Sequence, residues 1–208
     1  MSNPVTAPVI TFSRLRMQTD GKGVTTLVCF HNCPLRCKWC INPYSFAPDT
    51  KRTDMTSQAL FDKVKIDQLY FLATGGGVTF GGGEPLLYPT FLKEFREICG
   101  DAWHLCAETS LNVPWENVEL AASCIDHFFI DCKDTNPDIY RRYTGKDNQQ
   151  MLSNLQKLVS LIGTERIVVR MPLIPEFNTD ADRQASKALL EGMGVTQFNF
   201  FNYIIKKK

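Results

Sequence analysis

The sequence lacks the features that would place it in a membrane, in an export pathway or on a nucleic acid. No apolar run approaches the ~18 residues of a membrane span. The start, MSNPVTAPVITF, has no basic segment followed by a long apolar core, so we expect no signal peptide. The formal net charge of +1 gives bulk electrostatics no reason to favour nucleic acid or an anionic membrane. We therefore expect a cytoplasmic protein with no membrane or nucleic-acid partner.

Neither an internal repeat nor a low-complexity linker divides the chain. Its 208 residues are 44% hydrophobic and 22% charged, which is close to the average for globular proteins. A chain of this length usually forms one domain. We therefore expect a single domain over residues 1–208.

Short apolar segments alternate with longer amphipathic ones along the chain. Six segments rich in β-branched or aromatic residues are predicted to be strands: 23–30, 77–83, 103–109, 127–133, 166–174 and 197–203. Five segments with helical spacing are predicted to be helices: 54–73, 88–100, 114–123, 148–162 and 179–194. Strands separated by helices indicate right-handed crossovers and a parallel sheet, so the predicted fold class is α/β.

Polar residues gather at the carboxyl ends of the predicted strands, although strands of a parallel sheet are usually apolar. They are Glu84, Glu108, Thr109, Asp131, Lys133 and Arg170. Charges inside a sheet are costly unless they are paired or functional. One site at the carboxyl ends of the strands accounts for the whole set, as in barrel enzymes. We therefore expect a partial (β/α)6 barrel of the TIM type with its site at this end.

Four of the eight cysteines lie within residues 29–40, directly after the first predicted strand. Clustered thiols in a reducing compartment indicate metal binding or catalysis more often than disulfides. Three interpretations remain open: a [4Fe–4S] cluster on Cys33, Cys37 and Cys40 with one open iron, a four-cysteine zinc or cluster site, or ordinary buried thiols. The apolar stretch around Cys29 favours a core position for that residue. Three thiols in one tight loop fit an iron–sulfur cluster.

Two motifs in the expected order resemble those of the radical S-adenosylmethionine (SAM) enzymes. The first is C-x3-C-x2-C, with Trp39 before its last cysteine, and the second is GVTFGGGEP at 77–85. Longer segments at 19–43, 74–87, 129–145 and 168–178 are similar to the activating enzymes of glycyl radical enzymes. This resemblance spans residues 10–203. Because residues 41–76 contain no cysteine, we expect one cluster only.

The resemblance implies a role for each matching residue. Cys33, Cys37 and Cys40 would hold the cluster, and SAM would chelate its open iron. Gly82, Gly83 and Glu84 would receive the SAM amino group, Lys133 its carboxylate, and Trp39 the adenine. Asp20 and Arg170 match positions that hold the glycyl loop of the partner. The resemblance also implies a monovalent cation beside SAM, on Glu108, Thr109 and Asp131.

Three positions depart from the family pattern. Glu108 stands where the family usually has the shorter Asp, and Lys22 stands where its D-G-P-G turn has proline. After Tyr203 the family usually continues with His, whereas this chain reads Ile204, Ile205 and three lysines. These departures affect three features that the resemblance implies: the cation site, the rigidity of the turn after Asp20, and the adenine or substrate contact made by the last segment.

The implied activity is that of an anaerobic radical SAM oxidoreductase. The reduced cluster, supplied with electrons by a flavodoxin or ferredoxin, would cleave SAM to methionine and a 5′-deoxyadenosyl radical. In an activating enzyme this radical takes the α-hydrogen of a glycine on a partner glycyl radical enzyme. Three alternatives remain open: radical SAM chemistry on a small molecule or peptide, an activator of an anaerobic ribonucleotide reductase, and an iron–sulfur or zinc binding module without enzyme activity.

Overall fold

The computed structural model describes residues 4–17 and 19–203, so the segment after Tyr203 lies outside the described residues. All of its strands belong to one sheet in the order β3-β1-β2-β4-β5-β6-β7-β8. The strands are β1 (Thr6–Met17), β2 (Val24–Phe30), β3 (Thr53–Thr56), β4 (Gly77–Gly82), β5 (His104–Thr109), β6 (His127–Asp131), β7 (Ile167–Leu173) and β8 (Phe198–Asn202). Neighbours from β2 to β8 are parallel, which confirms the six predicted strands and the α/β class. The sheet is not closed, since β3 and β8 are its two edges, so the barrel is partial.

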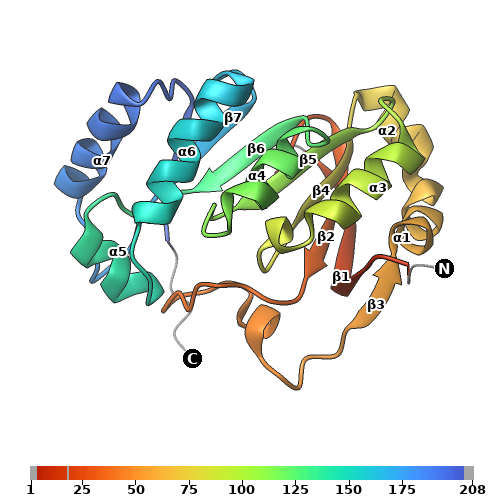
Figure 1. The fold of residues 1–208 in the computed structure, drawn as a ribbon, viewed down its shortest axis with the longest axis horizontal. Helices are drawn as coiled ribbons and strands as arrows, with labels where there is room; N and C mark the ends of the chain where they lie inside the picture. Colours follow the sequence, from red (N-terminus) through yellow and green to blue (C-terminus); the bar gives the residue numbers. More distant parts are fainter. Residues whose placement is uncertain (1–3, 18, 204–208) are drawn as a thin grey trace.

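The helices lie across one face of this curved sheet (Figure 1). They are α1 (Ser57–Val64), α2 (Gln68–Thr74), α3 (Pro89–Cys99), α4 (Trp115–Ala122), α5 (Pro137–Thr144), α6 (Gln149–Ile162) and α7 (Asp180–Gly192). Short 3-10 turns occur at Pro43–Phe46, Lys65–Asp67 and Pro85–Leu87. Helices α1, α3, α4 and α6 pack side by side in chain order. No helix among the described residues is long and apolar enough to cross a membrane.

The core lies between the sheet and these helices. Alternate strand residues such as Val28, Phe80 and Phe128 are fully buried there, as the period of two requires. Phe80 meets Phe95 of α3 edge to face at 5.4 Å between ring centroids. The intervening strand residues, among them Glu108 and Asp131, are directed to the opposite, concave face. The strands therefore separate an apolar core from a polar face.

Four elements differ from the sequence-based expectations. Strands β1 and β3 were not predicted, and they pair antiparallel at one edge of the sheet. Only the first part of β1 buries alternate residues, and a register shift occurs between Ser13 and Arg16, so its periodicity is weak. Helix α5 was not predicted either. The predicted helix over 54–73 is wrong in its extent, because β3 occupies 53–56 and a 3-10 turn separates α1 from α2.

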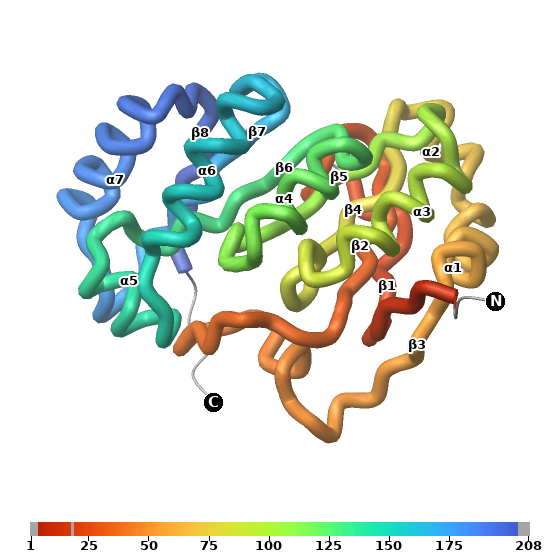
Figure 2. The backbone as a smooth tube through the Cα atoms, viewed as in Figure 1, coloured from red at the N-terminus to blue at the C-terminus, as the bar shows by residue number. Residues whose placement is uncertain are grey.

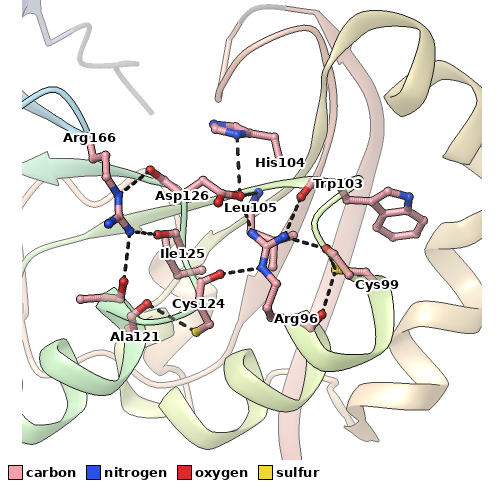
Figure 3. A network of polar contacts seen from close by, with 12 residues as sticks. Arg96, Cys99, Trp103, His104, Leu105, Ala121, Cys124, Ile125, Asp126 and Arg166 are labelled. Atoms are coloured by element: carbon pink, nitrogen blue, oxygen red, sulfur yellow. Dashed lines mark hydrogen bonds and ion pairs between the residues drawn. The ribbon is translucent and has the colours of Figure 1, made fainter. Parts of the chain in front are cut away.

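The loops at the amino ends of the strands are tied together by two arginines (Figure 3). Arg96 donates to the carbonyl oxygens of Trp103 and Cys124, both at 2.9 Å, and pairs with Asp126. Arg166 donates to the carbonyl oxygens of Ala122 at 3.0 Å and Asp126 at 3.1 Å. These contacts join helix ends to strand starts. They stabilise the end of the sheet opposite to the cysteine loop and leave the other end available for a site.

Candidate active site

A cavity of about 780 Å³ lies at the carboxyl ends of the parallel strands. Twelve residues that the sequence singled out line it: Asp20, Cys33, Cys37, Cys40, Gly82, Gly83, Glu84, Glu108, Thr109, Asp131, Lys133 and Arg170. Trp39 and Cys29 are not among the lining residues. The structure therefore brings the loop cysteines and the polar strand ends to one place.

The cysteine loop, residues 31–40, leaves the end of β2 and reaches across to α5 (Figure 2). Its backbone is held there, since the N–H of Arg36 donates to the carbonyl of Thr144 at 2.8 Å. The N–H of Lys38 donates to the carbonyl of Tyr143 at 3.0 Å. The last turn of α5 thus fixes the loop that carries the thiols.

The glycines after β4 allow this strand to approach the start of the loop. A Cβ atom at Gly83 would lie 2.1 Å from the carbonyl oxygen of Asn32, and one at Gly82 would lie 2.6 Å from the Cβ of Cys29. Gly82 also has a φ of 86°, in the region that favours glycine. Only glycine at these two positions lets β4 end against the cysteine loop with its backbone facing the cavity.

Glu84 is a buried carboxylate that, among the described residues, receives hydrogen bonds only from neutral donors. Its oxygens accept from the Thr109 hydroxyl at 2.7 Å, the Ser110 hydroxyl at 2.7 Å and the Ser110 N–H at 2.8 Å. Burial raises the pKa of Glu84, and these hydrogen bonds act in the opposite direction. The carboxylate joins the end of β4 to the end of β5. It therefore shapes the cavity wall through contacts within the protein.

Two ion pairs cross the concave face of the sheet. Arg170 Nη1 lies 2.7 Å from Glu108 Oε1, and Lys133 Nζ lies 3.0 Å from Asp131 Oδ2. Asp131 and Arg170 occupy paired positions of β6 and β7. Burial acts to lower the pKa of Lys133, but Asp131 and the neighbouring groups raise it above its ordinary value. Lys133 is therefore a fixed positive charge at the cavity wall.

Asp20 stands at the other side of the cavity, after β1, and is paired with Arg16. Arg16 Nη2 lies 3.0 Å from Asp20 Oδ1, and both residues line the cavity. Sequence reasoning missed Arg16, because β1 was not predicted. It also missed Ser110, although this residue directly follows Thr109. The carboxylates of Asp20, Glu108 and Asp131 thus each have a cationic partner from the chain itself.

The comparisons with known proteins agree with this arrangement. Residues 27–187 match the family model of the Radical SAM superfamily. A pyruvate formate-lyase-activating enzyme of Clostridium pasteurianum is 32% identical, over 81% of this chain and 69% of that protein. The chain belongs to the radical SAM superfamily, among the activating enzymes of glycyl radical enzymes.

Other similarities agree with this membership. A (2S)-3-sulfopropanediol dehydratase activating enzyme of Klebsiella oxytoca is 28% identical, over 77% of this chain and 69% of that protein. The crystal structure of Streptococcus suis SuiB superposes with a TM-score of 0.63 at 13% identity, over 85% of this chain and 38% of that one. At that identity the likeness to SuiB shows the fold alone.

The cysteine loop of this radical SAM protein fits a [4Fe–4S] cluster. Among the described residues no three His, Cys, Asp or Glu side chains converge on a point for a single ion. Three thiols that each bind a separate iron need no such convergence. One buried donor of the cysteine loop, Trp39 Nε1, has no hydrogen-bond partner among the described residues. Buried donors of this kind are suited to the sulfurs of a cluster.

Iron binding would have to remove the protons of these thiols. Burial raises the pKa of Cys33 to about 12 and that of Cys37 to about 11, so both are protonated at neutral pH. A metal binds the thiolate form and releases the proton, which removes the cost of a buried, uncompensated charge. Cys40 also has a raised pKa, with burial as the main cause.

The monovalent cation expected on Glu108, Thr109 and Asp131 does not fit the contacts of these residues. Glu108 is paired with Arg170, and Asp131 is paired with Lys133. The Thr109 hydroxyl donates to Glu84, and it accepts from the N–H of Leu111 at 2.9 Å. The three groups are therefore engaged within the protein.

Proposed function

We propose that this protein activates a glycyl radical enzyme by taking the α-hydrogen from a glycine of that partner. One observation carries the proposal: the three loop cysteines, the Gly-Gly-Glu strand end and Lys133 line one cavity of about 780 Å³. A volume of this size suits a small-molecule cofactor. The names of the relatives support the choice of a glycyl radical enzyme as partner.

In this proposal the cavity wall binds and orients the cofactors. Cys33, Cys37 and Cys40 would hold a [4Fe–4S] cluster, which, when reduced and bound to SAM, would supply one-electron chemistry for the cleavage of SAM. The backbone at Gly82 and Gly83 can approach the SAM amino group closely, because neither residue has a side chain. Lys133 offers a fixed ammonium group to the SAM carboxylate. Glu84 keeps the glycine turn in place, and Trp39 supports the adenine side.

Asp20 and Arg170 belong to the substrate side of the cavity. Both line it, and each is held by an ion pair, with Arg16 and Glu108 respectively. These paired groups offer a rigid polar surface to an entering peptide loop. A glycine suits such a site because no side chain blocks access to its α-carbon, and a flexible loop can enter the cavity mouth.

Three further parts of the proposal concern the setting of the reaction. A flavodoxin or ferredoxin is proposed as electron donor. A cytoplasmic location suits three reduced thiols, since that compartment keeps thiols unpaired. One continuous sheet across the described strands supports a single domain over residues 1–208.

The test is an anaerobic reconstitution with iron and sulfide, followed by dithionite, SAM and candidate glycyl radical enzymes. We expect 5′-deoxyadenosine, and a glycyl radical signal in the electron paramagnetic resonance (EPR) spectrum of one partner. The matched control is Cys37→Ser, which should give neither. Absence of 5′-deoxyadenosine from the intact protein would contradict radical SAM chemistry. Its formation without a glycyl radical on any candidate partner would contradict the activating function alone.

A further inference from the structure

Three of the four carboxylates that line the cavity are neutralised by side chains of the protein itself. The Arg170 guanidinium lies 2.7 Å from Glu108, the Lys133 ammonium lies 3.0 Å from Asp131, and Arg16 is paired with Asp20. Three negative groups thus face three positive ones. A soluble cation added beside Glu108 would meet the guanidinium at close range and be repelled.

Arg170 is held firmly in this position. Its side chain is 17% exposed, and its guanidinium carbon lies 4.5 Å from the centre of the Phe129 ring. Arginine packs well on aromatic faces and keeps its charge at any physiological pH. Phe129 and Glu108 are paired positions of β6 and β5, so both partners of Arg170 are fixed by the sheet. The longer arm of Glu108, compared with Asp, carries its carboxylate to the guanidinium.

We infer that this protein works without a soluble monovalent cation at its cofactor site, because the Arg170 guanidinium takes the place of that cation next to Glu108. Arg170 is then a positioning residue: it neutralises Glu108 and sets the charge of the wall against which SAM lies. This inference rests on the proposed function, since it assumes that SAM occupies the cavity.

The experiment compares SAM binding in potassium, sodium and choline buffers of equal ionic strength, using the anaerobically reconstituted protein. Choline is too large for a cation site of this kind. We expect the dissociation constant of the wild type to change by less than about twofold among the three buffers. A decrease in affinity of about tenfold or more in choline would overturn the inference.

Removal of the Arg170 guanidinium should have the opposite result, so that SAM binding depends on the cation. Arg170→Met leaves Glu108 without its partner, so SAM affinity should become dependent on potassium or sodium by about fivefold or more. Arg170→Lys retains a positive charge and should remain independent of the cation. Arg141→Met removes an exposed arginine of α5 and serves as the matched control. An Arg170→Met protein that folds and ignores the cation would contradict the inference.

The cluster-free protein offers a second measurement. The melting temperature of Arg170→Met should rise with potassium relative to choline, whereas that of the double variant Arg170→Met with Glu108→Gln should not. If Arg170→Met does not fold, the inference is tested by the SAM affinity of the wild type in the potassium, sodium and choline buffers alone. A protein that binds SAM without cation dependence but activates no glycyl radical enzyme would refute the proposed function and leave this inference intact.

Discussion

The four clustered cysteines differ by their surroundings. Cys29 lies in β2, half-buried against Gly82, and does not line the cavity. Cys33, Cys37 and Cys40 follow the strand and line it. The surroundings therefore separate one packing cysteine from three candidate ligands.

Cys29→Ser should leave the cluster assembled, whereas Cys37→Ser should abolish it. The reason is that only the loop thiols face the cavity. Iron content and visible absorbance after anaerobic reconstitution measure the difference. Loss of the cluster in Cys29→Ser, in a protein with unchanged circular dichroism, would show that the division between strand and loop thiols is wrong.

Tyr143→Phe should lower the reduction potential of the cluster by on the order of tens of millivolts, because a hydrogen bond to sulfur stabilises the reduced, more negative form. The Tyr143 side chain is fully buried, its hydroxyl is within electrostatic reach of Cys37 and Cys40, and its backbone holds Lys38 of the cysteine loop. An EPR-monitored redox titration gives the potential. Tyr44→Phe, at an exposed loop position, is the control. Equal potentials in the wild type and Tyr143→Phe would refute the proposed contact.

At the scale of elements, Asp67 explains why the predicted helix over 54–73 is interrupted. Its carboxylate is fully buried and accepts from Arg14 Nε at 2.8 Å and Nη2 at 2.6 Å, and from the Thr26 hydroxyl at 3.2 Å. These donors come from β1 and β2. The turn at Lys65–Asp67 therefore directs Asp67 into the sheet, and α2 begins anew after it.

Asp67→Asn should lower the melting temperature by several degrees at pH 7 and much less near pH 3. The hydrogen bond from Arg14 is the main cause of the lowered pKa of Asp67. The carboxylate therefore contributes stability above its unfolded-state pKa of about 4, and this contribution disappears as the pH falls through the lower folded-state pKa.

Thermal unfolding of both proteins from pH 3 to pH 7 measures this difference. Asp62→Asn, which disturbs an exposed ion pair with Lys65, is the control and should have little effect at either pH. A difference between Asp67→Asn and the wild type that stays constant with pH would contradict the role of the charge.

At the scale of the whole molecule, the cysteine loop depends on elements far away in sequence. The end of α5 binds the loop backbone, and the start of α5 is fixed by Asp134. Asp134 accepts from the N–H of Asn136 at 2.8 Å, from Asn178 at 3.1 Å and from Ser186 of α7 at 3.3 Å. The loop thus rests on a helix that the second half of the chain holds in place.

Asp134→Ala should lower the free energy of unfolding by about 2 kcal/mol, because it leaves buried donors unpaired. It should also reduce the iron content after reconstitution, although Asp134 does not line the cavity. Chemical denaturation and iron analysis measure the two effects. Glu119→Ala, an exposed change on α4, should alter neither. A destabilised Asp134→Ala protein with full iron content would show that the loop does not depend on α5.

The sequence by itself determined the parallel part of the sheet and the position of the candidate site. Strands such as 23–30 and 127–133 carry local runs of apolar, β-branched and aromatic residues, so they are readable without tertiary information. Polar residues at the ends of these strands, such as Glu84 and Lys133, could be assigned to one cavity because parallel strands end at the same edge. The spacing of Cys33, Cys37 and Cys40 is likewise a local property.

Only the tertiary structure decided which partner each of these groups has. The pairing of Glu108 with Arg170 joins residues 62 positions apart in the chain, and no local pattern encodes it. Strand β1 was hidden because only its first part buries alternate residues, and because it depends on β2 and β3 for pairing. The break at Asp67 follows from a long-range ion pair that overrides helical propensity. Local patterns determine which groups face the cavity, whereas contacts between distant segments decide how their charges are balanced.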